Sequence, residues 1–594
     1  MRELVTYLLK FLYRKYLTDP GRGSRRLPKE AVCGGPEELA EALLPIIAKV
    51  LPSTLAETKR QRTPPVAPAL LALAILIGVV LRFADLHGVP PALNQDEAVN
   101  GYDAYSLFLT GRDHLGHPFS FAGLESFGDW VTPLLTFLTV PAVGLFGLQT
   151  EVLRSVSALV GVLLIPIMYL LAVELFGRRS IGLVAAFAIA LDPWHVHLSR
   201  WAISPSVMPT MVALTMLAIV WTAHRRSSRG IVTVAVAAGL TIASYPTMKF
   251  YVPLLGLAGL AAYWRDLRHI KIEAMLYAAI IFIVIAAPAL YLSTVDPGGR
   301  ARFDQVSIFH LPNLGFSLLK NQYQAYFSPS FLFLSGDGDP MHSPPGFGVA
   351  LLTSFPFLIV GLFWLLKSLV RPGKPIERQS SLFLFLALLL YPLPGSLTLP
   401  SPHGLRAAHV IPLLDLTTAI GIVIGLFAFL ARPSADRRIA VPQAILAGGF
   451  LLVFAAIPTD LYQHFDNYFN HYPKEVAPSF QFGLQQALSY AHLHEREYDQ
   501  IWVVDTNEPY IYVLFFNQWL PSEVHDKLQV SRNPPGFNQV YAFGKYHFLF
   551  LPSSINKNQL RILYTVNYPS GGVAYQVRGG VAGQGGRVLV VSRS

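Results

Sequence analysis

The chain has 594 residues, of which 53% are hydrophobic and only 14% are charged, whereas soluble domains average about 25% charged residues. The apolar residues form long uncharged runs, and a bilayer core of roughly 30 Å needs about 20 such residues per helix. This composition excludes an ordinary soluble domain and predicts a polytopic α-helical membrane protein. The net charge of +10 does not imply nucleic acid as a partner, because cytoplasmic loops of membrane proteins collect Lys and Arg.

Residues 1–63 carry basic clusters between short apolar stretches, and we expect a cytoplasmic basic tail. The opening segment has apolar residues at helical spacing. It could lie on an anionic membrane surface or form a solvated helix, and both readings stay open. The single cysteine, Cys33, excludes an intramolecular disulfide.

Basic clusters further along the chain indicate the topology. Two apolar runs separate each neighbouring pair of clusters, so the five clusters can share one side of the membrane. The apolar stretch 130–148 is interrupted by prolines and glycines, and we expect it to lie in the outer interface instead of crossing. Eleven spans follow, with the N-terminus in the cytoplasm and the C-terminus outside: 66–83, 155–176, 180–195, 205–223, 230–246, 248–264, 272–293, 347–367, 380–397, 409–431 and 439–458.

These spans divide the chain into a membrane region, 64–458, and a C-terminal region, 459–594. The membrane region contains two long outer loops, 84–154 and 294–346. The C-terminal region has a more ordinary charge density, short β-like runs and one helical pattern. We therefore expect it to form a small extracytoplasmic α/β domain, since its length is well within ordinary domain size.

Two adjacent acids, Asp96 and Glu97, follow the first span. On a helix their side chains would point about 100° apart and have different surroundings. One of them could act as a general base on an acceptor hydroxyl or bind a divalent cation. Asp96 could equally cap a helix. Asp129 precedes the apolar interface segment, where an acid would be favoured by the dipole of a helix starting there.

Basic residues on the outer side are informative because the topology rule would remove them. Arg200, Lys249 and Arg406, with His403, lie at outer span ends. Their convergence would suit an anionic lipid head group, and snorkelling to ordinary lipid phosphates is the alternative. The turn Asp337-Gly338-Asp339-Pro340 begins like a calcium loop, but the downstream Gly and Glu are missing, so a metal is not expected there.

The sequence has no Walker loop, no dinucleotide fingerprint and no zinc-finger spacing. A nucleotide-sugar site is therefore unsupported, and a lipid-borne donor is favoured. The ordered short motifs resemble the lipid-carrier-dependent glycosyltransferases of GT-C fold, in particular the bacterial branch related to protein O-mannosyltransferases and the aminoarabinose transferase of lipid A. The motifs are Asp96-Glu97-Ala98, Asp129…Pro133-Leu134, Leu145-Phe146-Gly147, Arg154, Leu175-Phe176-Gly177-Arg178, Asp192-Pro193-Trp194-His195, Ser199-Arg200, Tyr245…Lys249…Pro253 and Pro402-His403…Arg406…Pro412.

The resemblance implies transfer of a sugar from a polyprenyl-phosphate carrier to an extracytoplasmic acceptor, with inversion at the anomeric carbon. Asp96 is the leading candidate for the catalytic base, with Glu97 beside it. The implied phosphate site contains Lys249, Arg406, His403, Arg200 and Tyr245, and the candidate acceptor pocket contains Asp129, His195, Ser204 and His342.

Ser204 stands where the family often has an acid, so a metal shared by two outer-loop acids is not expected. No cofactor is certain; a divalent cation, Mg or Mn, is possible, and Asp96 would then be its ligand. The expected partners are the lipid-linked donor, membrane lipids and a protein, lipid or glycan acceptor, with no nucleic acid, at the plasma membrane. Two alternatives stay open: a transporter or flippase for a lipid-linked sugar, and a non-catalytic envelope scaffold.

Overall fold

The computed structural model describes residues 66–295, 297–311, 315–370, 375–430, 437–504, 507–533, 537–548, 559–565, 573–579 and 588–591. The predicted basic tail 1–63, with its opening amphipathic segment and Cys33, lies outside the described residues.

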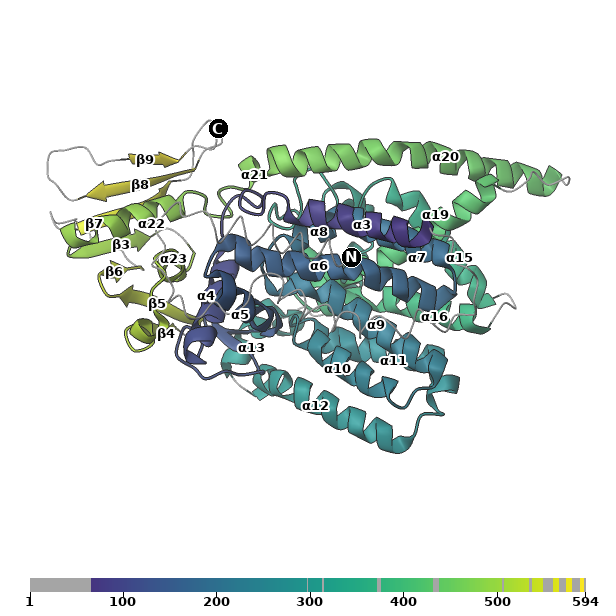
Figure 1. Cartoon of the computed structure of the whole chain (residues 1–594), viewed down its shortest axis with the longest axis horizontal. Coiled ribbons are helices and arrows are strands. Elements are labelled where there is room, and N and C mark those ends of the chain that lie inside the picture. The colour runs from purple at the N-terminus through teal and green to yellow at the C-terminus, as the bar shows by residue number, and fades with distance from the viewer. Residues whose placement is uncertain are drawn as a thin grey trace.

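Most of the chain forms a bundle of long apolar helices that run roughly parallel in Figure 1. Each predicted span overlaps one of them. Within the described ranges, six helical segments are long and apolar enough to cross a membrane, and a seventh crossing results if α7 and the short α8 (Pro193–Ser199), bent by 58°, count as one. The bundle comprises α3 (Val66–Phe83), α6 (Thr150–Phe176), α7 (Arg179–Leu191), α9 (Met208–Arg225), α10 (Gly230–Ile242), α11 (Met248–Leu267), α12 (Ile272–Val295), α15 (Ser354–Val370), α16 (Pro375–Leu390), α19 (Ile411–Leu430) and α20 (Arg437–Asp466).

The two ends of the bundle differ in kind. The chain reverses between α6 and α7, α9 and α10, α11 and α12, α15 and α16, and α19 and α20 at the right-hand end of Figure 1. The basic clusters of the sequence fall at these reversals. The first outer loop and the C-terminal strands lie at the opposite end. The chain is thus a polytopic helical membrane protein with one basic end.

The first outer loop consists of α4 (Gln95–Thr110), a hairpin of β1 (Leu124–Ser126) and β2 (Asp129–Val131), and α5 (Leu134–Phe146). α5 has 13 residues and is therefore about 20 Å long, shorter than the roughly 30 Å bilayer core. It packs on α4 and α6, in keeping with the expectation that 130–148 does not cross. The expected role of Asp129 at a helix start is wrong: Asp129 begins β2 opposite Ser126, and Pro133 holds the N-cap position of α5.

A second set of short elements lies at the same end. Ser307 bridges Thr398, which joins the long outer loop to the turn before α19. The loop elements are α13 (Pro297–Val306), η3 (Ile308–His310), α14 (Phe316–Ala325) and the π-helix η4 (Ser330–Leu334); the turn contains α17 (Pro392–Ser396), α18 (Gly404–Ala407) and η5 (Ala408–Val410).

The C-terminal region is built around a seven-stranded mixed sheet of order β4-β5-β6-β3-β7-β8-β9. The central strand β3 is parallel to β6 and β7, and the other neighbours are antiparallel. The elements are η6 (Asn467–His471), α21 (Tyr472–Glu475), α22 (Leu484–Leu493), η7 (Glu495–Glu497), β3 (Gln500–Val504), α23 (Pro509–Phe516), α24 (Pro521–Val524), β4 (Gln529–Asn533), β5 (Phe537–Phe543), β6 (Tyr546–His547), β7 (Gln559–Thr565), β8 (Val573–Gly579) and β9 (Val588–Val591). The region is therefore α/β, as its sequence pattern predicts.

This region is not a separate body, because it shares a hydrophobic core with the first outer loop. Buried side chains of α4, α22, α23 and the sheet belong to one cluster. The hydroxyl of Tyr102 on α4 donates to the carbonyl of Trp519 at 2.8 Å. The Nε2 atom of His114 lies 3.1 Å from the hydroxyl of Tyr510 on α23. Burial of apolar surface thus holds the C-terminal region against the helix that carries Asp96 and Glu97.

Candidate functional site

Glu97 is part of a fully buried ion pair with Arg154 of α6. Arg154 Nε lies 2.8 Å from Oε1 and Nη2 lies 2.9 Å from Oε2, so the contact is bidentate. The remaining donors of the guanidinium reach the carbonyls of Leu86, Pro90 and Ala92 at 2.6–2.9 Å. The pair therefore ties the segment after α3 to α6.

The carboxylate of Glu97 also accepts two backbone hydrogen bonds. The N–H of Ala202 donates to Oε1 and the N–H of Asn94 donates to Oε2, both at 3.1 Å. Asn94 is the N-cap of α4 and forms a capping box with Glu97. We correct the expected catalytic role of Glu97 to a structural one, because its oxygens are occupied and its side chain is inaccessible.

Asp96 has the opposite environment, as the 100° separation on a helix predicts. Asp96 is exposed in the first turn of α4. The expected alternative, Asp96 as the helix cap, is wrong: Asn94 is the cap, and the N–H of Asp96 donates to the Asn94 side chain at 2.8 Å. The helix dipole favours the ionised form of an acid at this place.

A carboxylate of the C-terminal region lies near Asp96. Glu508 precedes α23 and is half-buried, with a left-handed backbone at φ 47° and ψ 55°. Burial raises the pKa of Glu508 to about 7; the nearby His114 opposes this rise and the charge of Asp96 adds to it. A left-handed conformation is uncommon for a residue other than glycine, and such residues cluster at functional sites. The sequence carried no local signal for this neighbour.

Arg200 and His195, two further predicted site residues, are enclosed by protein groups, and their roles in phosphate and acceptor binding stay predictions. The guanidinium of Arg200 is buried and donates to the carbonyls of Leu81, Asp85 and Val89 at 2.8–3.1 Å. His195 is fully buried, and its Nδ1 lies 2.7 Å from Arg82 Nη2. Both side chains tie the end of α3 to the segment around α8.

Lys249 lies in the first turn of α11, beside the hairpin of the first outer loop. Its ammonium contacts the Ser293 hydroxyl of α12, and the charge of Asp129 acts on it. The hydroxyl of Thr132 donates to the Ser244 carbonyl at 3.1 Å, which joins the hairpin to the α10–α11 turn. Two predicted residues, Lys249 and Asp129, therefore lie at one place.

Two further predicted residues, Tyr245 and Ser204, are half-buried. Tyr245 lies in the α10–α11 turn, four residues before Lys249. Ser204 begins the 3₁₀ helix η2 (Ser204–Val207) that leads into α9.

Arg406 lies in α18 and is mostly buried. Its Nη1 donates to the Thr398 hydroxyl and the Leu399 carbonyl at 2.9 Å and to the Pro400 carbonyl at 3.2 Å. The Ser307–Thr398 bridge places this turn beside the loop that follows α12. Arg406 thus belongs to the same end of the bundle as Lys249, and its position depends on a turn that the guanidinium itself stabilises.

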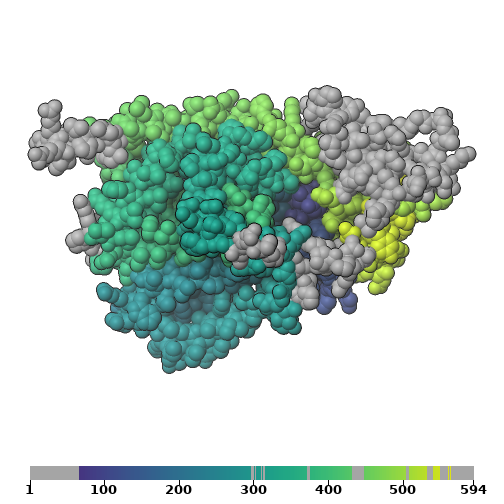
Figure 2. All heavy atoms as spheres, turned by 180° about the vertical axis from the view of Figure 1, so that it is seen from behind, coloured from purple at the N-terminus to yellow at the C-terminus, as the bar shows by residue number. Residues whose placement is uncertain are grey.

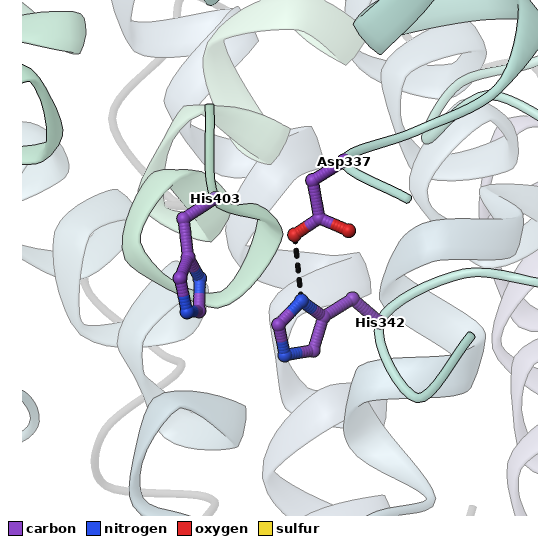
Figure 3. A group of neighbouring side chains, drawn as sticks. All are labelled: Asp337, His342 and His403. Atoms are coloured by element: carbon purple, nitrogen blue, oxygen red, sulfur yellow. Dashed lines mark hydrogen bonds and ion pairs between the residues drawn. The ribbon is translucent and has the colours of Figure 1, made fainter. Parts of the chain in front are cut away.

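His342 and His403, both predicted site residues, lie together with Asp337 (Figure 3). His342 Nδ1 is 2.6 Å from Asp337 Oδ2, and the N–H of Gly404 donates to the same oxygen at 2.6 Å. The two imidazole rings have centroids 4.6 Å apart. One ligand atom from each of the three residues lies within 4.8 Å of the others. The group can hold a metal ion, whereas the turn sequence Asp337-Gly338-Asp339-Pro340 predicts no metal in this loop.

Aromatic residues connect the segment beside this group to Arg200. His197 Nε2 lies 2.8 Å from the Met341 carbonyl, and its Nδ1 lies 3.2 Å from the Tyr468 hydroxyl. Tyr468 in turn lies beneath the guanidinium of Arg200 at 5.9 Å. Figure 2 shows a hollow between the green helices and the yellow C-terminal strands, with dark-blue residues from the first part of the described chain at its floor.

A hydrophobic cavity of about 340 Å³ lies between α7, α15, α19 and α20. Its walls are apolar apart from Asp192, Asp415 and a few hydroxyl side chains. Asp415 was not predicted as a site residue, although an acid inside an apolar span is itself a signal of function. It directly precedes the uncharged run 416–430, by which this span is recognised.

Comparisons with known proteins show what the chain is similar to. Residues 107–302 match the family described as dolichyl-phosphate-mannose-protein mannosyltransferase. No curated protein sequence matches the chain. Among solved structures, apo ArnT from Cupriavidus metallidurans is 15% identical, with 76% of this chain and 85% of that chain covered and a TM-score of 0.49.

The Archaeoglobus fulgidus oligosaccharyltransferase with a tethered acceptor peptide is 13% identical, with 76% and 63% covered and a TM-score of 0.48. The S. cerevisiae Pmt1-Pmt2 complex bound to the sugar donor is 19% identical, with 39% and 33% covered and a TM-score of 0.30. The family match agrees, over residues 107–302, with the resemblance to protein mannosyltransferases that the ordered motifs predict.

Proposed function

We propose that the protein is a membrane glycosyltransferase that moves a sugar from a polyprenyl-phosphate carrier to an extracytoplasmic acceptor. The observation that carries this proposal is the contrast between two adjacent acids. Glu97 is locked by Arg154, whereas Asp96 is exposed on the same rigid turn. A base held on a rigid element beside an open surface can accept a proton from a bound hydroxyl.

The reaction is a direct displacement. The acceptor hydroxyl transfers its proton to Asp96 while its oxygen bonds to the anomeric carbon. The bond from that carbon to the phosphate oxygen breaks, and its electron pair leaves with the lipid phosphate. Attack opposite the leaving group inverts the anomeric centre. Lys249 and Arg406 stabilise the negative charge that gathers on the phosphate.

Charge and topology support the orientation. The chain reversals that carry the basic clusters form the cytoplasmic end, and the first outer loop and the C-terminal region face outward. The hydrophobic cavity is lined by the first turns of α19, which follow the turn that carries Arg406. An isoprenoid chain in this cavity would place its phosphate near the outer end of the bundle.

In this displacement the proton goes to Asp96, and Lys249 and Arg406 balance the negative charge of the phosphate leaving group. Mg or Mn bound at Asp96 stays a prediction. The acceptor, whether protein, lipid or glycan, binds in the hollow between the bundle and the C-terminal region. Glu508 provides a second carboxyl group near Asp96.

The decisive experiment compares wild type with Asp96→Asn in purified protein reconstituted with a labelled polyprenyl-phosphate sugar. We expect transfer to fall at least about 100-fold, the lower range for loss of a general base, while donor binding is retained. Unchanged transfer would remove Asp96 from the mechanism. Translocation of the labelled lipid without transfer would instead favour a flippase.

Lys249→Ala and Arg406→Ala test the phosphate site in the same preparation. Each change should weaken donor binding by roughly tenfold or more, since a charge-assisted hydrogen bond contributes about 1.5–3 kcal/mol. Arg229→Ala, at the basic end of the bundle, is the matched control and should bind donor normally. Normal donor binding in both test variants would show that the phosphate lies elsewhere.

A further inference from the structure

The group formed by Asp337, His342 and His403 joins two segments that are far apart in the chain. Asp337 and His342 belong to the end of the long outer loop, and His403 precedes α18 in the turn before α19. The His342 side chain is 9% exposed and that of Asp337 is 4% exposed. These two side chains are thus largely removed from bulk water, and His403 is half-buried.

The geometry is close to what a small ion requires. In a tetrahedral zinc site with bonds of about 2.0–2.1 Å, ligand atoms are separated by about 3.3 Å. The present atoms all lie within 4.8 Å of one another, and His342 Nδ1 and Asp337 Oδ2 are 2.6 Å apart. An ion that replaced the shared proton would push this last pair apart by less than about 1 Å.

The electrostatics also fit a cation. The carboxylate of Asp337 accepts hydrogen bonds from the backbone N–H groups of Gly404, at 2.6 Å, and of Asp339, at 3.0 Å, so its oxygens are held in place beside His342. Asp339 adds negative charge on the other side of the ring, with Oδ2 3.8 Å from His342 Nε2.

The donor set selects the ion. Two imidazoles and one carboxylate suit Zn and other late first-row metals, whereas Mg prefers an all-oxygen octahedron. Three protein ligands leave a fourth position for water. We infer that Asp337, His342 and His403 form a zinc-class metal site that clamps the long outer loop to the turn carrying Arg406.

The clamp acts on Arg406 through the turn. Arg406 donates to Thr398, Leu399 and Pro400, and the same turn closes through His403 and the Gly404 N–H, which reaches Asp337. An ion bound to His403 and Asp337 would hold the turn at one more point and so position the guanidinium. Because His403 and Arg406 belong to the same short segment, His403 would act as a positioning residue for Arg406. This second step rests on the proposed function; metal binding itself does not.

The test uses the full-length protein in detergent, stripped with a chelator and titrated with Zn²⁺ or Co²⁺ in the absence of donor and acceptor. Wild type should retain one equivalent of zinc by elemental analysis and show visible Co²⁺ absorption of tetrahedral type. His342→Gln and His403→Gln should each weaken zinc binding by about tenfold to a hundredfold. His494→Gln is the control, because this histidine lies on the C-terminal domain and pairs with Glu497.

Zinc should also raise the melting temperature of wild type and of His494→Gln but not of the two test variants. The glutamine variants keep a polar side chain, so we expect them to fold. A cooperative melting transition without metal checks that they do. Absence of bound ion in wild type, or equal binding in all variants, would overturn the site and leave a hydrogen-bonded His–Asp–His group only.

The clamp is tested separately by donor binding. Chelation should weaken donor binding in wild type, and zinc should restore it, whereas His403→Gln should bind donor weakly with or without zinc. Asp96→Asn should bind zinc normally, so a failure of the catalytic proposal leaves the metal result intact. If zinc binds with one equivalent and donor binding does not change, the positioning role of His403 is wrong.

Discussion

Glu97 and Arg154 face each other across the start of the outer loop with both side chains fully buried, joined by two hydrogen bonds of 2.8 and 2.9 Å. Removing one partner of such a pair leaves an uncompensated buried charge. Because the same guanidinium also holds the carbonyls of Leu86, Pro90 and Ala92, the pair sets the position of α4 and hence of Asp96.

Glu97→Gln should therefore destabilise the protein by about 3–5 kcal/mol, measured by thermal or denaturant unfolding in detergent. The control is Glu151→Gln, which loses a partly exposed contact to His87 and should cost less than about 1 kcal/mol. A Glu97→Gln protein of normal stability that lacks transfer activity would restore the catalytic role that the sequence suggested.

Glu508 predicts a pH dependence of stability. Burial raises its pKa from 4.5 to about 7, so the folded state holds this proton more tightly than the unfolded state. Its stabilising contribution is complete below about pH 4.5 and is lost as the pH rises through about 7. Glu508→Gln removes this dependence. The variant should match wild type near pH 4.5 and exceed its melting temperature at pH 8.

Glu475→Gln is the matched control, since Glu475 is exposed on α21. Its melting temperature should differ from that of wild type by the same amount at both pH values. A Glu508→Gln difference that is likewise independent of pH would show that Glu508 is solvated and does not face Asp96.

Gly101 lies where α4, α6 and α23 meet, and a Cβ atom there would collide with Leu153 and approach Phe515 to 2.9 Å. Gly101→Leu should weaken the packing of the C-terminal domain on α4 by about 1–3 kcal/mol. Limited proteolysis should release that domain faster. Gly256→Leu, on an exposed face of α11 with no atom within 4 Å of its Cβ position, should leave the cleavage rate unchanged.

The membrane architecture was accessible from the sequence because its signals are local. Apolar runs predict helices, and basic clusters predict which reversals share a side. The short helix at 134–146 was recognisable by its prolines and glycines. The cap of α4 was also readable, since Asn94 and Glu97 have capping-box spacing, although the pattern was assigned to Asp96 instead.

The site depended on contacts between distant residues. Asp96 and Glu97 have nearly the same local sequence environment, and only the arrival of Arg154, 57 residues later, buries one and leaves the other exposed. Asp337 and Gly404 are 67 residues apart, and Tyr102 and Trp519 are 417 apart. Sequence by itself determined the helices, the basic end and the α/β character of the C-terminal region, because each follows from neighbouring residues. The tertiary structure decided which acids and cations are buried in ion pairs and backbone contacts and which are exposed, because burial and charge pairing exist only after the chain has packed.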